Sequence, residues 1–277
     1  MTEFVLILFC VSIVAGFLGA LAGLGGGVLI VPVLTIGFGA DIRYAIGASI
    51  VSVIATSSGA AAAYVRDRIT NLRVGMFLEL ATTTGAIVGA LVAGLVNPAV
   101  LFVIFGLALL VSVIPLAARL GEELPSDVVN DAWATHLRLA SSYEDAFLDR
   151  RVHYQVTRVP LGLALMWLAG LLSGLLGIGS GTFKVLAMDV AMRMPMKVST
   201  TTSNFMIGVT AAASAGIYFS RGDVNPLVAA PVALGVLLGA GLGSRHLLRL
   251  SNRAIRMVFI PLLIAIAIEM LLRGLGV

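Results

Sequence analysis

Six long apolar runs dominate the sequence and constrain its fold more than any other feature. Each run has about 20 residues, the length a helix needs to cross ~30 Å of hydrocarbon. Hydrophobic residues make up 59% of the 277-residue chain and charged residues only 12%. Such a composition excludes a soluble enzyme and a disordered chain, and it predicts an all-α polytopic membrane protein. The runs lie at about 44–64, 75–96, 99–118, 198–219, 227–248 and 254–272.

Two further apolar regions are interrupted by glycine clusters. Region 4–38 contains GLGGG at 23–27, and region 159–194 contains GIGSG at 177–181. The piece after each cluster has about a dozen residues, too few for a comfortable span. Each region is therefore predicted to be a broken helix or a re-entrant hairpin. Because lipid cannot satisfy free backbone groups, the unwound parts are expected where they line a cavity or pack within protein.

The two halves of the chain are copies of each other. A shift of 154 residues places the first half on the second without a gap, and glycine, serine, tyrosine and asparagine stay in register as well as apolar residues. The sequence predicts a first transmembrane repeat at 1–118, a polar linker at 119–158 and a second repeat at 159–277. Each repeat would hold one broken region followed by three transmembrane helices. Matched pairs include Gly23 with Gly177, Ser49 with Ser203, Thr56 with Thr210, Tyr64 with Tyr218, and Asn71 with Asn225.

Arginine placement predicts that the two repeats have inverted topology. Cytoplasmic loops are enriched in Lys and Arg. Where one repeat has an arginine-rich loop, the equivalent loop of the other repeat is poor in arginine, so equivalent loops are expected on opposite sides of the membrane. This rule puts the central linker in the cytoplasm. We expect the chain to lie in the cell inner (plasma) membrane. Loop 65–73 holds three arginines and turn 91–102 none, whereas the loop after 198–219 holds one and turn 245–256 holds four.

The central segment 119–158 is the one polar stretch, with seven acidic residues, five arginines, and His136 and His153. We interpret it as a linker with a helical piece near 127–141, and a regulatory or partner-docking role is the alternative. Two histidines among carboxylates do not define a metal site, and Cys10 is the single cysteine. No metal, cofactor or nucleic acid is expected.

The glycine breaks and a polar cluster form the predicted substrate site. A helix that restarts after a break presents unpaired N–H groups and a positive dipole end, which favour an anion. Hydroxyl and amide groups add neutral donors. The alternatives are close helix packing and Ser/Thr bonds to their own helix. The predicted substrate-binding residues are Gly25, Gly26, Gly27, Ser49, Gly179, Ser180, Gly181, Thr202, Ser203 and Asn204.

Three ionisable residues within apolar runs are candidates for coupling or gating. Lys184 could attract an anion, and Asp189 could pair with it or carry a proton. Snorkelling of Lys184 to the headgroups is the alternative. Glu79 lies near the end of its run, where an interfacial position is the first interpretation and a proton carrier the second.

No enzyme motif accounts for these residues. Neither glycine cluster fits G-x-G-x-x-G, and no histidine lies inside an apolar run to serve as a base for Ser180. The sequence therefore predicts a protein that is not an enzyme.

Three stretches resemble the TauE/SafE sulfite-exporter-like family of membrane permeases: GALAGLGGGVLIVP (19–32), SGLLGIGSGTFKVL (173–186) and TTSNFMIGVTAAAS (201–214). The similarity covers about 15–118 and 159–272. It implies an inverted-repeat permease that exports small sulfur-containing or organic anions, such as sulfite or a sulfonate, with coupling to protons. Ser180 stands where many members of that family have a third glycine.

The sequence thus predicts a secondary transporter for a small anion, working by alternating access. A passive anion channel is one alternative, and a non-transporting membrane subunit or sensor that docks partners through 119–158 is another. Stretches of small residues would also permit a homodimer.

Overall fold

The computed structural model describes residues 2–22, 25–118, 124–125, 127–145, 147–246 and 252–276. Over these residues the chain is mostly helical, as expected for a polytopic membrane protein. The first half contains α1 (Thr2–Ala22), α2 (Gly27–Pro32), the π-helical turn η1 (Val33–Gly37), α3 (Ile42–Arg66), α4 (Leu72–Ala93) and α5 (Pro98–Ala118). The second half contains α7 (Val159–Leu176), α8 (Gly181–Leu186), η2 (Ala187–Ala191), α9 (Met196–Ser220), α10 (Pro226–His246) and α11 (Asn252–Leu275).

Both apolar regions with glycine clusters are broken helices. In each, a long helix stops at the cluster, and a short helix followed by a π-helical turn comes next, at 27–37 and 181–191. The short helices begin at the last glycine of each cluster, Gly27 and Gly181. Among the described residues, four helices are long and apolar enough to cross a membrane, namely α3, α4, α7 and α10.

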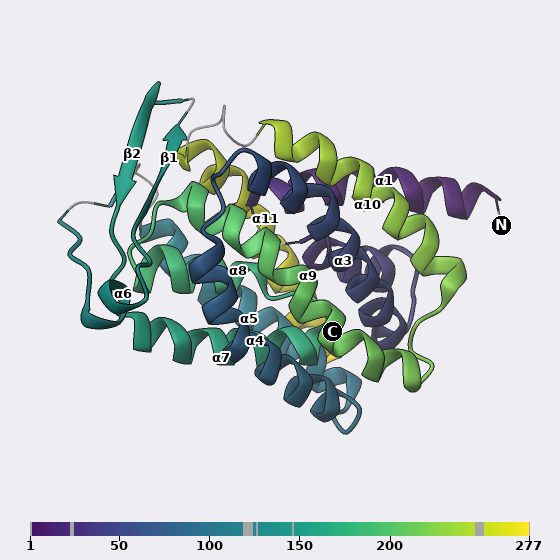
Figure 1. The fold of residues 1–277 in the computed structure, drawn as a ribbon. Coiled ribbons are helices and arrows are strands. Elements are labelled where there is room, and N and C mark those ends of the chain that lie inside the picture. The colour runs from purple at the N-terminus through teal and green to yellow at the C-terminus, as the bar shows by residue number, and fades with distance from the viewer. Residues whose placement is uncertain are drawn as a thin grey trace.

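Close helix pairs build the two flanks of the molecule. α1 lies beside α10 on one flank, and α4 lies beside α7 on the other (Figure 1). A Cβ added to Gly85 would lie 2.2 Å from the carbonyl oxygen of Trp167, and one added to Gly239 would lie 2.0 Å from that of Ile13. Only glycine allows backbones this close. Both contacts are related by the 154-residue shift, so equivalent glycines make equivalent contacts.

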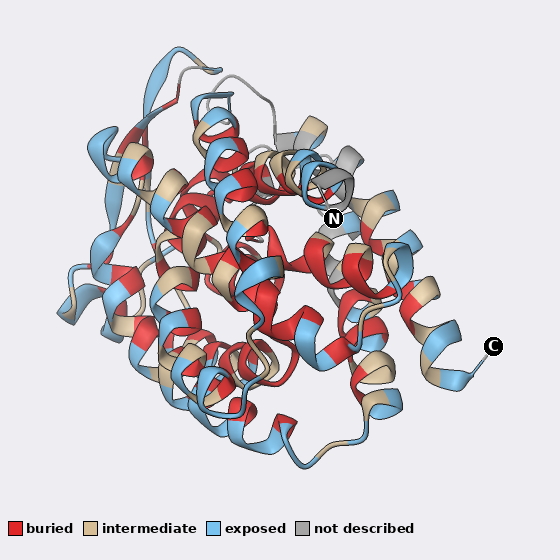
Figure 2. Ribbon diagram, turned by 90° about the vertical axis from the view of Figure 1, so that its right-hand side faces the viewer, coloured by how far each residue is buried: buried red, intermediate tan, exposed pale blue. Residues whose placement is uncertain are grey.

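The middle of the molecule holds α3 and α9, which run antiparallel. Near the start of α3, Gly47 contacts the backbone of Asp223 beyond the end of α9. Just past the other end of α3, the backbone N–H of Asn71 donates to Thr202 Oγ1 near the start of α9, at 3.1 Å. Buried residues face this middle region, whereas exposed residues lie on the outside (Figure 2). Many of the exposed side chains are large and apolar, as a lipid-facing surface requires, among them Leu80, Leu91, Leu168, Leu234 and Leu238.

The central segment differs from its predicted form. Only α6 (Ala132–His136) is helical within 127–141, and two antiparallel strands follow, β1 (Ser141–Asp145) and β2 (Arg150–Tyr154). The all-α expectation is therefore wrong for this segment. Tyr143 and Asp145 alternate with exposed residues along β1, a period of two that favours a strand over a helix.

The hairpin of β1 and β2 lies at one end of the helices (Figure 1). We call this the hairpin end, and it holds the start of α9. The opposite end of the α3–α9 pair is called the far end, and it holds the start of α3.

Candidate functional site

The glycine clusters adopt backbone conformations that other residues disfavour. Gly25, Gly177 and Gly179 have φ angles of +69°, +65° and +72°. These left-handed values stop each helix and turn the chain, and glycine adopts them without the steric cost of a Cβ. Ser180 also has a positive φ, of +48°, although it carries a side chain. Such strain persists only where the surrounding structure holds it, and it often occurs at functional sites.

The two breaks meet in the middle of the molecule. A Cβ added to Gly27 would lie 2.5 Å from Ser49 Oγ and 3.3 Å from the Cα of Ile178 in the other break. Ser49 Oγ also donates to the carbonyl oxygen of Gly177 at 2.7 Å. The structure therefore brings together Gly25–Gly27, Ser49 and the second glycine cluster, although 128 residues separate the two bonded groups.

Two apolar side chains fill the space between the breaks. A Cβ on Gly25 would lie 2.8 Å from Ile207, and a Cβ on Gly179 would lie 2.6 Å from Val53. Val53 and Ile207 are themselves 154 residues apart, so each half of the chain contributes the matching position. Sequence analysis missed this pair because an apolar residue within an apolar run carries no distinguishing signal.

The polar residues of α9 divide between two places. Ser203 Oγ donates to the carbonyl oxygen of Gly181 at 3.3 Å, and Asn204 Nδ2 donates to that of Ala20 at 2.9 Å. These two residues therefore reach the ends of both broken helices. Thr202 instead accepts from the Asn71 backbone and lies toward the hairpin end.

Several buried polar atoms near the breaks have no hydrogen-bond partner among the described residues: Ser180 Oγ, Thr182 Oγ1 and Asn204 Oδ1. All three residues are at most 3% exposed. An unsatisfied buried polar group is costly, so such atoms usually have a role in binding water, an ion or a ligand. Two hydroxyl donors and one amide oxygen are thus available beside the breaks.

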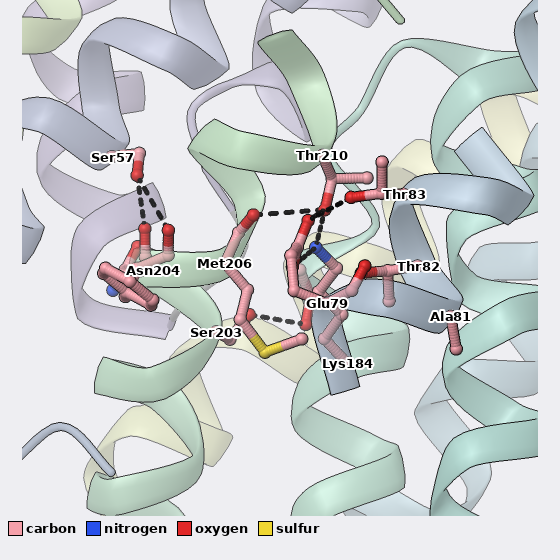
Figure 3. A network of polar contacts seen from close by, with 12 residues as sticks. Ser57, Glu79, Ala81, Thr82, Thr83, Lys184, Ser203, Asn204, Met206 and Thr210 are labelled. Carbon is pink, nitrogen blue, oxygen red and sulfur yellow. Dashed lines mark hydrogen bonds and ion pairs between the residues drawn. The ribbon is translucent and has the colours of Figure 1, made fainter. Parts of the chain in front are cut away.

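A second polar cluster joins Glu79 of α4, Lys184 of α8 and Thr210 of α9 (Figure 3). Thr210 donates to Glu79 Oε1 at 2.6 Å and accepts from Lys184 Nζ. Lys184 Nζ lies 3.7 Å from Glu79 Oε2, and Thr83 donates to Glu79 Oε1 at 3.0 Å. The cluster therefore holds one cation and one carboxylate, joined by hydroxyl groups.

This arrangement corrects one expectation. Glu79 is only 8% exposed and faces Lys184 inside the protein. Lys184 is fully buried and does not snorkel, and its carboxylate partner is Glu79. Asp189 lies in η2 and is 1% exposed. The Lys184–Glu79 pair was missed because the two residues are far apart in the sequence and no local pattern connects them.

No group of three or more His, Cys, Asp or Glu side chains that could hold a metal ion occurs within the described part of the chain.

Buried helices, lipid-compatible outer faces and two facing helix breaks define a class of protein: a polytopic membrane protein whose unwound backbone lies at its centre. The chain matches the family described as "Sulfite exporter TauE/SafE" over residues 8–270. It therefore belongs to the TauE/SafE family of membrane transporters.

The chain is similar to several curated proteins over nearly their whole length. The chain is 28% identical to "Probable membrane transporter protein YunE" of Bacillus subtilis, covering 97% of each chain. It is 26% identical to "Probable membrane transporter protein ORF9" of Sinorhizobium sp, covering 95% of this chain and 91% of that one. A "Probable membrane transporter protein" of Haemophilus influenzae is 24% identical, with 90% and 88% covered. No solved structure matches the chain.

Proposed function

We propose that the protein is a secondary transporter that exports a small sulfur-containing or organic anion, such as sulfite or a sulfonate. The anion would bind between the two glycine breaks, and rocking of one repeat against the other would alternate its access to the two sides. The predicted binding groups are the backbone of Gly25–Gly27 and Gly179–Gly181, with Ser49, Ser203 and Asn204. These three side chains would turn from the carbonyl oxygens to which they donate and bond the anion instead.

One observation carries this proposal: two breaks from different halves meet at one place, beside buried polar groups without partners. Backbone N–H groups and hydroxyls stabilise an oxyanion without burying a second charge. The Ser180 and Thr182 hydroxyls supply such donors. Val53 and Ile207 would move aside, or the anion would bind beside them, as the two repeats shift.

Inverted topology of the repeats is the second part of the proposal. The antiparallel arrangement of α3 and α9, which are equivalent in sequence, supports it. So does the pairing of α5 with α11, in which Gly106 contacts Leu271 and Gly274 contacts Val103. The positive-inside rule would place the hairpin end in the cytoplasm of a cell whose inner membrane holds the protein.

Coupling to protons is the third part of the proposal, and it involves Glu79 and Lys184. A buried carboxylate and a buried amine that share Thr210 can gain or lose a proton when an anion binds or leaves nearby. Lys184 is three residues from Gly181 in the short helix after the second break, so its charge is close to the proposed anion site.

Flux of radiolabelled sulfite and of a small sulfonate in proteoliposomes tests the function. We expect saturable uptake that is stimulated by counter-substrate, and Glu79→Gln should remove its dependence on a proton gradient. Steady current without counter-exchange would favour a channel. Absence of flux and of any thermal shift with sulfur oxyanions or small carboxylates would contradict the proposed substrate class.

A further inference from the structure

The hairpin inserts a carboxylate into the hairpin end of the helices. Asp145, the last residue of β1, lies 2.6 Å through Oδ1 from Nζ of Lys197, the second residue of α9. Both residues are buried, at 3% and 1% exposure. The Lys197 amine also lies 5.5 Å from the centroid of the Phe147 ring. A polar segment thus makes a desolvated ion pair with a helix that reaches the glycine breaks.

Asp145 is held firmly by its own segment. Tyr143 donates its hydroxyl to Asp145 Oδ2 at 2.9 Å, and the backbone N–H groups of Phe147 and Leu148 donate to Oδ1 at 2.9 and 3.2 Å. The hairpin therefore presents a rigid, fully bonded carboxylate to Lys197.

A second set of contacts ties the same segment to α4. The Asn71 side-chain amide donates to the Leu139 carbonyl oxygen at 2.8 Å and to the Tyr154 hydroxyl at 2.9 Å. Burial raises the pKa of Tyr154 to about 12, so its hydroxyl stays neutral. Because the Asn71 backbone donates to Thr202, one residue links the hairpin, α4 and α9. The hairpin therefore bridges helices that alternating access would have to move.

Stability alone is a poor explanation for this ion pair. Burying two charges costs desolvation free energy that their attraction often fails to exceed. The N-terminus of α9 adds the positive end of a helix dipole to the charge of Lys197, so this position favours an anion. The hydroxyls of Ser199 and Thr200, within one turn of Lys197, are buried and have no hydrogen-bond partner in the described part of the chain. Donors for an oxyanion are therefore present at this place.

The other repeat gives an internal comparison. Lys197 is 154 residues from Arg43, the second residue of α3. Arg43 is exposed and lines an open pocket of about 270 Å³ at the far end, together with Arg221 and Asp223. The equivalent cation is thus accessible in one repeat and covered by Asp145 in the other.

We propose that Lys197 is an anion-binding residue at the hairpin end, and that Asp145 occupies it as an internal competitor of the transported anion. The hairpin is then an inhibitory gate, which opens when Asp145 leaves Lys197. This inference rests on the proposed function for the identity of the anion. The gate itself can be tested without knowing that anion.

Cysteine labelling in the full-length protein measures access to the hairpin end. Ser199→Cys in a Cys10→Ser background is treated with an anionic and a cationic methanethiosulfonate reagent. Asp145→Asn should raise the labelling rate for the anionic reagent roughly tenfold. This corresponds to about 1.4 kcal/mol, the free energy lost when the Asp145 carboxylate no longer competes for Lys197. The labelling rate of the cationic reagent should increase less. Adding Lys197→Gln to Asp145→Asn should make the increases for the two reagents equal.

Glu144→Gln is the matched control, because Glu144 is an exposed carboxylate on the same strand. It should leave both labelling rates unchanged. Tyr143→Phe, which removes one hydrogen bond from Asp145, should give a smaller increase of the same kind and serves if Asp145→Asn fails to fold. Equal rates in Asp145→Asn and the parent would overturn the gate, as would an equal effect of Glu144→Gln.

Proteoliposome flux separates this inference from the proposed function. With sulfite presented at the hairpin end, Asp145→Asn should increase kcat/KM and Lys197→Gln should raise KM. Flux in the parent with unchanged labelling in Asp145→Asn would refute the gate alone. Charge-selective labelling without flux of any tested anion would refute the proposed substrate class and leave the anion-binding role of Lys197 supported.

Discussion

Each end of the α3–α9 pair holds a cation at the start of one helix. The two cations occupy equivalent positions in the sequence, but their surroundings differ. At the far end, Arg43 is exposed beside an open pocket, and its guanidinium makes a long hydrogen bond of 3.5 Å to the Val96 carbonyl oxygen. At the hairpin end, Lys197 is buried under Asp145. A duplicated scaffold would make the two ends alike. The difference comes from the hairpin, whose Asp145 covers Lys197 at one end only.

The far-end pocket also lies close to the glycine breaks. Ile46 lines this pocket, and a Cβ added to Gly177 would lie 2.4 Å from Ile46 Cγ2. Tyr218, another lining residue, donates its hydroxyl to the Gly174 carbonyl oxygen at 2.6 Å. One layer of side chains therefore separates the pocket from the second break. The difference between the two ends is therefore local to the two cations: Arg43 borders the far-end pocket, whereas Lys197 is covered by Asp145.

The largest expected effect is on stability and tests the unequal burial of the two cations. Lys197→Met leaves the Asp145 carboxylate buried without its cation and should lower the free energy of unfolding by about 3 kcal/mol. Arg43→Met removes an exposed charge and should change it by less than about 0.5 kcal/mol. Thermal unfolding in detergent measures both. Combining Lys197→Met with Asp145→Asn should recover part of the loss, and similar losses for the two Met variants would contradict the comparison.

The next effect tests whether the two halves share one scaffold. Gly85→Ala and Gly239→Ala each place a Cβ within about 2 Å of a backbone carbonyl oxygen. Each should cost about 1–3 kcal/mol, because the helix pairs must separate. Gly216→Ala is the control, since nothing lies within 4 Å of its added Cβ. Thermal unfolding should show two similar losses, and a loss in only one variant would mean that the flanks are not equivalent.

The broken helices follow from local properties of the sequence. Helix lengths and breaks depend on local properties, the apolar run and the glycine φ angles, so 4–38 and 159–194 were both identified as broken. The 154-residue shift appears in the sequence because glycines such as Gly85 and Gly239 stand at matching positions, and in the structure each lies against a backbone carbonyl oxygen.

The ion pairs could not be predicted, because they join residues without a local relation. Lys184 meets Glu79 and Lys197 meets Asp145 only after the helices pack. The sequence analysis assigns the hairpin only to the polar linker 119–158 and predicts no strand there, because its two strands are short and strongly charged. The alternation of buried Tyr143 and Asp145 was the signal that could have identified it.

A smaller effect concerns pH at the hairpin end. Burial raises the pKa of Asp145, but the hydrogen bond and charge of Lys197 and the hydrogen bond from Tyr143 bring it below its usual value. A lowered folded pKa means that the stabilisation is complete above the unfolded value, about 3.9, and is lost as pH falls through the folded value. The Tm difference between the parent and Asp145→Asn should therefore be constant from about pH 8 to about pH 5 and should narrow below about pH 4. Narrowing between pH 8 and pH 5 would contradict this assignment, and Glu144→Gln should show no such trend.

The smallest expected effect concerns the far end, where the cation is open to solvent. Arg43→Gln should lower kcat/KM for anions presented at that end by about two- to threefold at low salt, because an exposed charge mainly steers the approach of the ligand. At about 1 M salt the Debye length is ~3 Å, and the difference should disappear. Arg68→Gln, an exposed charge beyond the other end of α3, should leave this uptake unchanged. An equal loss at high salt would mean that Arg43 binds the anion directly, and the two cations would then differ only in whether the hairpin covers them.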